Sequence, residues 1–292
     1  MVPITETNPI STPTKKTNFL VLLYGVLGAA VLFLALGPLL SRRDPLWGVV
    51  LTEFIAIGLP AMYCRKRFRT KERKAMSLKE AAILTVALFP VILVINGLFL
   101  EGLNQLLPLE NQNLDIIKSN GSLIKQLITL AIIPAFFEEL FFRSVICEQF
   151  ARRSPMGSVL FSAILFALFH FQWQNSMAPF LFGLALGYIY LYGGLKASVF
   201  SHFLYNFCSI LFVRSFSESW MKTLGDLALV RGMGGVKNFM TLVLLAGSAL
   251  GIFIILRKSS KRPLPKGSAV VRGKEWIPVA ALVLVYVIKT FA

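Results

Sequence analysis

Charged residues are scarce in this sequence, and acidic residues are the scarcest of them. Asp, Glu, Lys and Arg make up 15% of the 292 residues, whereas a soluble globular domain contains roughly a quarter. This composition argues against a soluble enzyme. Cysteine is also rare: Cys64, Cys147 and Cys208 lie in or beside apolar runs and form no CxxC pair. The sequence therefore predicts neither a disulfide scaffold nor a cysteine metal site.

Long apolar runs take the place of the missing charges, and hydrophobic residues reach 56% of the chain. A helix that crosses a bilayer needs about 20 mostly apolar residues, and lipid requires its backbone hydrogen bonds to close internally. The sequence thus predicts an all-α fold, a polytopic integral membrane helical bundle of eight transmembrane helices with a ninth at the C-terminus. The eight runs cover about 18–40, 46–63, 81–100, 122–147, 156–173, 176–195, 197–213 and 237–256, and the shorter ninth covers 276–291.

Basic residues outnumber acidic ones by 30 to 14, and their positions predict an orientation. With the N-terminus inside, the inner segments carry 20 Lys and Arg residues and the outer loops carry seven. Basic residues concentrate on the cytoplasmic side of membrane proteins. We therefore expect a multi-pass protein with a cytoplasmic N-terminus, in a bacterial plasma membrane. The basic clusters then contact anionic membrane lipid, and no nucleic acid is expected as a partner.

The apolar runs and the polar residues within them divide the chain into four segments. Residues 1–17 are polar and form a short cytoplasmic tail, and 18–120 hold the N-terminal membrane spans. Residues 121–215 hold most of the polar residues within spans and form the expected catalytic core. Residues 216–292 hold the C-terminal span or spans with a basic cytoplasmic loop.

Ionisable and amide side chains inside the expected spans are few. Burying such groups in lipid is costly, so they are functional candidates by default. Both histidines of the protein are among them. The set consists of Glu53 in the second run, Glu138, Glu139 and Arg143 in the fourth, His170 in the fifth, and His202 and Asn206 in the seventh.

Helical spacing sorts these residues into faces, because positions four apart lie on the same side of a helix. Glu139 and Arg143 can pair and neutralise each other, which leaves Glu138 on another face without a local counter-charge. His202 and Asn206 project together by the same spacing. The ring of Phe166 can brace His170 in the same way.

Depth along the expected helices also brings these residues together. Counted from the inner ends of their runs, Glu138 lies about 13 Å deep, His170 about 20 Å and His202 about 8 Å, so we expect the three side chains to meet in the inner half of the bilayer. A carboxylate in such a cavity can take a proton from water, and imidazole or amide groups can stabilise an oxyanion. We therefore expect a hydrolytic site with Glu138, His170, His202 and Asn206 as catalytic residues.

At these positions the sequence resembles the CPBP family, also called Abi or the type II CAAX prenyl endopeptidases. Three family motifs occur in order and without departure. EExxxR reads Glu138-Glu139-Leu140-Phe141-Phe142-Arg143, FxxxH reads Phe166-Ala167-Leu168-Phe169-His170, and HxxxN reads His202-Phe203-Leu204-Tyr205-Asn206. The resemblance is strong over about 120–215.

The resemblance implies a membrane-embedded, glutamate-type endopeptidase. Glu138 would activate the water, while His170, His202 and Asn206 would complete the site and stabilise the oxyanion. Glu139 and Arg143, with Phe166, would support the site or hold the substrate's C-terminal end. The implied substrate is a hydrophobic or lipid-modified peptide in a membrane, for example one of the prenylated CaaX type.

Other chemistries and functions stay open at this point. The favoured interpretation has no metal and no cofactor, and the alternative is zinc held by Glu138, His170 and His202. The family also contains non-catalytic members, so a membrane regulator or bacteriocin-immunity protein on the same fold is the alternative function. A transporter with a proton relay is a third class, but no inverted repeat accompanies the polar residues.

Overall fold

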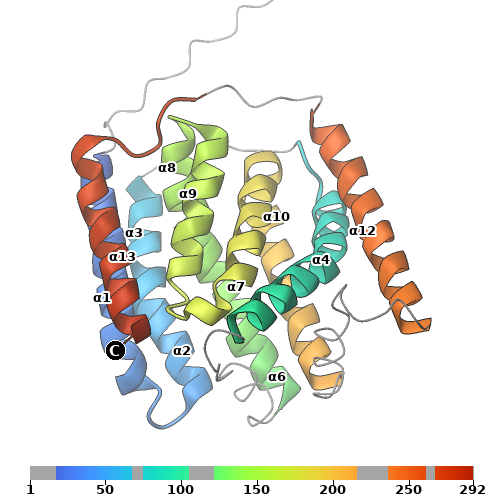
Figure 1. Ribbon diagram of the computed structural model, residues 1–292. Helices are drawn as coiled ribbons and strands as arrows, with labels where there is room; N and C mark the ends of the chain where they lie inside the picture. The colour runs from blue at the N-terminus through green and yellow to red at the C-terminus, as the bar shows by residue number, and fades with distance from the viewer. Residues whose placement is uncertain (1–17, 68–74, 105–121, 216–235, 261–266, 292) are drawn as a thin grey trace, which may run out of the picture.

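The computed structural model describes residues 18–67, 75–104, 122–215, 236–260 and 267–291, and every described regular element is helical. Figure 1 shows the helices packed side by side in one bundle. Four helical segments are long and apolar enough to cross a membrane: Phe19–Leu40, Pro45–Arg65, Leu78–Leu100 and Met177–Ser215. The all-helical bundle is thus confirmed, whereas the eight spans and the ninth are not.

The first three long helices follow the expected runs and begin where capping residues stand. Helix α1 covers Phe19–Leu40, and the Asn18 side chain accepts a bond from the Val21 N–H. The second run is one helical rod made of α2 (Pro45–Glu53), a π-helical stretch η1 (Phe54–Gly58) and α3 (Leu59–Arg67). Helix α4 covers Leu78–Asn104 and starts at a capping box between Ser77 and Glu80. These caps bind N–H groups that a helix start leaves free.

The fourth run is another composite rod, and it carries the glutamate pair. It consists of α6 (Leu123–Gln126), η2 (Leu127–Ile132), α7 (Ile133–Glu138), η3 (Glu139–Cys147) and α8 (Glu148–Ala151), where η2 and η3 are π-helical. Pro134 lies at the start of α7. Because proline has no N–H, it cannot continue the regular hydrogen-bond ladder, and π-helical turns surround this position.

Helix α9 is shorter than expected. It covers Pro155–Leu168, so the predicted fifth span of 156–173 is wrong at its end. Ser154 caps its start, with Pro155 at the first helical position. Beyond Leu168 the chain turns, Phe171 takes a positive φ of 48°, and a short 3₁₀ turn, η4 (Trp173–Asn175), follows. His170 therefore lies in this turn and not within the helix.

Element α10 (Met177–Ser215) contains both of the next two runs, which meet at Gly194. Gly194 has φ 76° and ψ −174°, a conformation that is essentially confined to glycine. The chain folds back there, as the contact between the two halves of α10 shows: the Phe182 and Tyr205 rings stack with centroids 3.9 Å apart. In an uninterrupted helix, residues 23 apart would be separated by roughly 34 Å. Figure 1 shows the two halves of α10 beside each other.

The C-terminal helices are α12 (Val236–Ser260) and α13 (Trp276–Phe291), the latter preceded by the 3₁₀ turn η5 (Gly273–Glu275). Large apolar side chains on their outer faces are exposed, among them Leu250 and Phe253 on α12 and Leu284 and Ile288 on α13. Soluble proteins rarely expose apolar surface on this scale. Outward-facing apolar surface of this kind suits contact with lipid.

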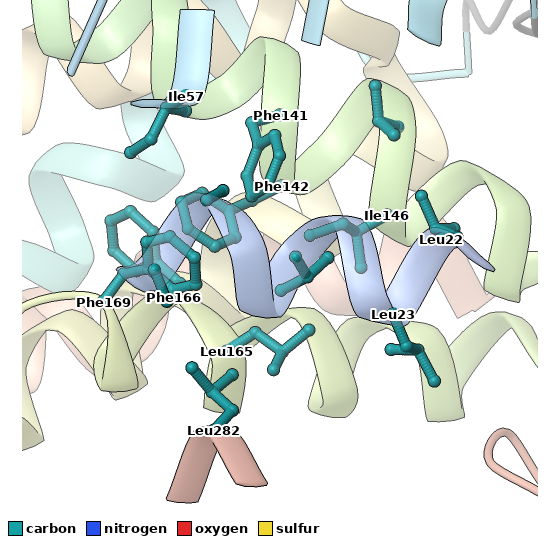
Figure 2. Close-up of a cluster of buried hydrophobic side chains, with 14 of the residues drawn as sticks. Leu22, Leu23, Ile57, Phe141, Phe142, Ile146, Leu165, Phe166, Phe169 and Leu282 are labelled. Carbon is teal, nitrogen blue, oxygen red and sulfur yellow. The ribbon is translucent and has the colours of Figure 1, made fainter. Parts of the chain in front are cut away.

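The apolar core holds the inner faces of α1, η1, η3, α9 and α13 together (Figure 2). Phe142 and Phe166 lie in its middle, with ring centroids 5.2 Å apart. Helices α9 and α10 approach closely, since a Cβ added at Gly183 would lie only 3.1 Å from Ala163 Cα. Small residues permit such contact between membrane helices. This packing brings the motif-bearing helices together.

Contacts between chain segments define the two ends of the bundle. At one end, Arg153 binds Glu275 and the Val270 carbonyl, and the N–H of Met76 binds the Tyr192 carbonyl. The Arg153 bonds place 152–153 beside the described part of 257–274, and Figure 1 shows the start of α4 at the same end of the bundle. At the other end, Lys125 pairs with Asp44. This ion pair lowers the pKa of the Asp44 carboxyl, and the Trp47 N–H lowers it further.

Candidate active site

The glutamate pair and Arg143 form the innermost part of the candidate site. Glu139 Oε2 accepts a bond from Arg143 Nε at 3.2 Å, and both side chains are fully buried. The spacing of four residues thus produces the predicted pair. Arg143 also donates from Nη1 to Ser162 Oγ at 3.2 Å, and its guanidinium lies 5.1 Å from the centre of the Phe166 ring. Arg143 is fully buried, and it contacts the candidate site through Glu139 and through the Phe166 ring.

His202 connects this buried pair to Glu138. The fold-back at Gly194 brings His202 against the fourth run, 63 positions away in sequence. Its Nδ1 lies 3.1 Å from Glu139 Oε1, and its Nε2 lies 3.6 Å from Glu138 Oε2. The carboxylate of Glu139 is paired with Arg143 and accepts hydrogen bonds only, so His202 Nδ1 carries the proton and donates it. Glu139 therefore fixes the orientation of the ring.

Glu138 differs from Glu139 in its exposure. The Glu138 side chain is 14% exposed, whereas the Glu139 side chain is fully buried. With Nδ1 of His202 protonated, a neutral ring turns a lone pair toward the Glu138 carboxylate, and two acceptors repel each other. This geometry is favourable when one proton resides on Glu138 or on His202 Nε2. Of the two carboxylates beside His202, Glu138 is therefore the one that solvent can reach.

His170 is fixed by its own motif. Its Nδ1 lies 2.8 Å from the carbonyl oxygen of Phe166, and because a carbonyl only accepts, Nδ1 is the donor. The Phe166 ring lies 5.0 Å from the His170 ring and 5.7 Å from the His202 ring. Phe166 thus braces both imidazoles, whereas the spacing predicted this only for His170. The two histidines are near enough to interact electrostatically.

Asn206 uses its amide group differently from the expectation. Its Nδ2 donates a hydrogen bond to the backbone carbonyl of Leu130 at 3.0 Å. Leu130 lies two turns before Glu138 on the fourth run. Asn206 lies on the same stretch of α10 as His202, one turn further along. Its amide nitrogen is directed to the backbone of the neighbouring helix.

Glu53 is a further acidic residue beside the candidate site. It is 4% exposed, and its Oε2 has no hydrogen-bond partner among the described residues. Its carboxyl group interacts electrostatically with that of Glu138. The second run packs here against α7, with the Phe54 and Phe137 rings 5.4 Å apart. Glu53 was singled out as an acid within an apolar run, but no motif joined it to the other residues.

A zinc site of the alternative kind needs three protein ligands grouped around one position. Among the described residues, no three His, Cys, Asp or Glu side chains are grouped so that they could hold a metal ion. Glu138 and His202 approach each other, and His170 Nδ1 is bound to the Phe166 carbonyl, which leaves its Nε2 as the ring nitrogen open to a ligand. The metal-free site and the zinc alternative both stay predictions.

Comparison with known proteins supports the resemblance that the motifs indicate. Residues 120–208 match the model of a family described as type II CAAX prenyl endopeptidase Rce1-like. The match covers less than a third of the chain and contains Glu138, His170, His202 and Asn206. No curated protein and no solved structure matches the chain significantly. The apolar helices and this match together indicate an integral membrane protein with a protease-like domain.

Proposed function

We propose that the protein is an intramembrane endopeptidase that hydrolyses a peptide bond in a membrane-associated substrate. One observation carries the proposal. The partly exposed carboxylate of Glu138 lies beside His202, whose other ring nitrogen is held by the buried Glu139–Arg143 pair. This contact lies inside the segment that matches the endopeptidase family.

In this proposal Glu138 is the general base. Its carboxylate removes a proton from a water molecule while the water oxygen bonds to the substrate carbonyl carbon. The tetrahedral intermediate then collapses, the C–N bond breaks, and the leaving amine takes the proton from Glu138. Water has been added across the peptide bond and the base is regenerated. His202 borders the path of this proton, since its Nε2 is 3.6 Å from Glu138 Oε2.

The remaining candidates complete the site around that step. His170 donates from Nδ1 to the Phe166 carbonyl, so its Nε2 can stabilise an oxyanion only when the ring is protonated. Asn206 completes the site on the α10 side, and Phe166 supports both histidines. Glu139 and Arg143 hold His202 in place. The proposed mechanism is of the glutamate type and uses no metal step.

The substrate class follows from the surroundings of the site. Because the site lies between apolar helices, the substrate is a peptide with a hydrophobic segment or a lipid anchor, and a prenylated CaaX-type peptide fits the matched family. The basic end of the bundle faces the cytoplasm in this proposal, with anionic lipid around it. The expected location is a bacterial plasma membrane.

The test compares peptides in membranes of cells that produce the wild type, Glu138→Gln or Glu148→Gln. Glu148 is a matched control, because it is a buried carboxyl on the same rod that binds the Tyr190 hydroxyl at 2.8 Å and lies outside the site. The wild type and Glu148→Gln should give the same cleavage products. Glu138→Gln should give none of them, although the three proteins are present in the membrane at equal levels. Equal cleavage by Glu138→Gln would refute the base assignment. A cellular phenotype that survives Glu138→Gln and His202→Ala would support the regulator or immunity alternative.

A further inference from the structure

Phe171 directly follows His170 and has a backbone conformation that large residues rarely adopt. Its φ is 48°, and among the described residues it is the one non-glycine residue with a positive φ. A residue with a bulky side chain is strained in this region, and such strain persists only where surrounding contacts hold the residue in place. The conformation of the turn that carries His170 therefore depends on what holds Phe171.

Hydrogen bonds within the turn fix only its first part. The His170 N–H binds the Ala167 carbonyl at 3.2 Å, and the Phe171 N–H binds the Leu168 carbonyl at 3.1 Å. Both bonds lie on the N-terminal side of the Phe171 Cα, so neither of them fixes rotation about its N–Cα bond. The constraint on φ has to come from the Phe171 side chain or from the chain beyond it.

The Phe171 side chain packs against two helices that are distant in sequence. It is 7% exposed. The Phe33 ring of α1 is stacked on the Phe171 ring with centroids 5.9 Å apart, and the Tyr286 ring of α13 lies at 6.4 Å. Aromatic rings at such separations attract each other in addition to the apolar area that they bury. These contacts fix where the Phe171 ring lies, and with it the backbone next to His170.

Helix α13 has anchors of its own. Leu282, one turn before Tyr286, is 1% exposed and belongs to the apolar core that also contains Leu165 of α9. Figure 2 shows both side chains among those of this core. At the start of the helix, Glu275 binds Arg153 through both carboxylate oxygens. Because α13 is fixed in this way, its Tyr286 ring offers the turn a fixed surface.

We propose that Tyr286 is a positioning residue for His170: its ring contact with Phe171 holds the turn in the conformation that presents the His170 ring to the candidate site. Tyr286 and Phe33 both lie outside the segment 120–208 that matches the endopeptidase family. The candidate site thus depends on helices at the two ends of the chain. The catalytic consequence rests on the proposed peptidase function.

The first test needs no substrate. The protein has two histidines, so nitrogen-isotope labelling of histidine in the full-length protein in detergent gives two sets of ring signals in NMR spectra, which His170→Gln assigns. The His170 signals report the turn, because its Nδ1 donates to the Phe166 carbonyl. Tyr286→Ala should shift the His170 signals and leave those of His202 in place. Tyr286→Phe, which keeps the ring, should shift neither set, and neither should Ile288→Ala, a control on the exposed face of α13 that is 56% exposed.

The second test measures the catalytic consequence with a fluorogenic farnesylated peptide that has a CaaX end. Tyr286→Ala should lower kcat by up to about 100-fold, the cost of misplacing a catalytic group by about 1 Å. KM should change little, because an oxyanion forms only as the reaction proceeds. Tyr286→Phe and Ile288→Ala should stay close to the wild type. In a Phe171→Gly background, which lacks the ring and tolerates a positive φ, Tyr286→Ala should cause no further loss, since both residues act through one contact.

The two tests separate this inference from the proposed function. Unchanged His170 signals in Tyr286→Ala would show that the inference is wrong, even when the wild type cleaves the peptide. A shift of the His202 signals as well would mean that α13 supports the whole bundle, which contradicts a role specific to His170. An equal loss of kcat in the Phe171→Gly background would also exclude the proposed route through Phe171. If Tyr286→Ala shifts only the His170 signals but the wild type cleaves nothing, the peptidase function fails and the positioning contact stands.

Discussion

Two carboxylate–arginine pairs of this protein differ mainly in where they lie. Glu139 and Arg143 are fully buried in the middle of the bundle and hold His202. Arg153 and Glu275 lie at one end of the bundle, 17% and 15% exposed, at 2.6 Å. Both pairs have similar chemistry, but only the first is shut off from solvent. The partly exposed pair joins two chain segments. The fully buried pair, in contrast, holds the ring of His202, a candidate catalytic group, in a fixed orientation.

The buried pair should be the costlier one to break. Arg143→Met leaves the Glu139 carboxylate buried without its counter-charge, and such a change costs about 3–5 kcal/mol. Arg153→Met removes a partly exposed pair and the contact of its guanidinium with the Phe19 ring, 3.6 Å from its centre, and should cost clearly less. Thermal unfolding of both variants in the same detergent measures the difference.

A second substitution sharpens that result. Glu139→Gln in the Arg143→Met background removes the stranded charge, so the double variant should unfold at a higher temperature than Arg143→Met alone. Equal losses of stability for Arg143→Met and Arg153→Met would contradict the claim that burial distinguishes the two pairs.

Gly194 is the point at which α10 folds back and brings His202 to the buried pair. Its replacement should lower stability less than Arg143→Met and more than loss of the Arg153–Glu275 pair. An alanine at φ 76° and ψ −174° is strained by about 1–3 kcal/mol. Gly194→Ala should therefore lower the unfolding temperature and displace His202, with loss of cleavage. Gly97→Ala is the control, because nothing lies within 4 Å of an added Cβ at that helical position, and there alanine should be neutral or slightly stabilising. Similar behaviour of the two variants would show that the fold-back does not depend on glycine.

Spacing along single helices was a reliable guide in this sequence. It predicts the Glu139–Arg143 pair, since residues four apart share a helix face. It also predicts the contact between Phe166 and His170, which is present although His170 lies in the turn after α9. Depth along the expected helices places His202 with Glu138, and the two side chains lie 3.6 Å apart. The long apolar runs predicted the all-helical class, because lipid leaves the backbone few other choices.

Contacts between helices and the ends of helices were less predictable. Hydropathy continues past Leu168 into Phe169 and Phe171 and hides the end of α9, so His170 was placed inside a span. The bond from Asn206 to Leu130 depends on the register of two helices, which no pattern within one helix reports. Glu53 comes near the candidate site through packing of the second run against α7, where the Phe54 and Phe137 rings meet. The roles of all these residues in catalysis stay predictions.

The exposed pair should have the smallest effect, and it should show in the pH dependence of stability. The bond from Arg153 lowers the pKa of the Glu275 carboxyl below its ordinary value, and the Arg272 N–H contributes to the same shift. A lowered pKa in the folded state means that this stabilisation is complete above the pKa of the unfolded chain, about 4.3. It is lost as the pH falls through the folded-state pKa.

Since the pair is partly solvated, its contribution to the free energy of unfolding should be below about 1 kcal/mol. Glu275→Gln should therefore lower the unfolding temperature slightly at pH 7, and the gap to the wild type should narrow as the pH falls below about 4.3. If the difference in unfolding temperature between Glu275→Gln and the wild type widens on acidification, Glu275 is less stable as a carboxylate than as the neutral acid. The contact between Arg153 and the segment before α13 would then depend on the bond from Arg153 to the Val270 carbonyl.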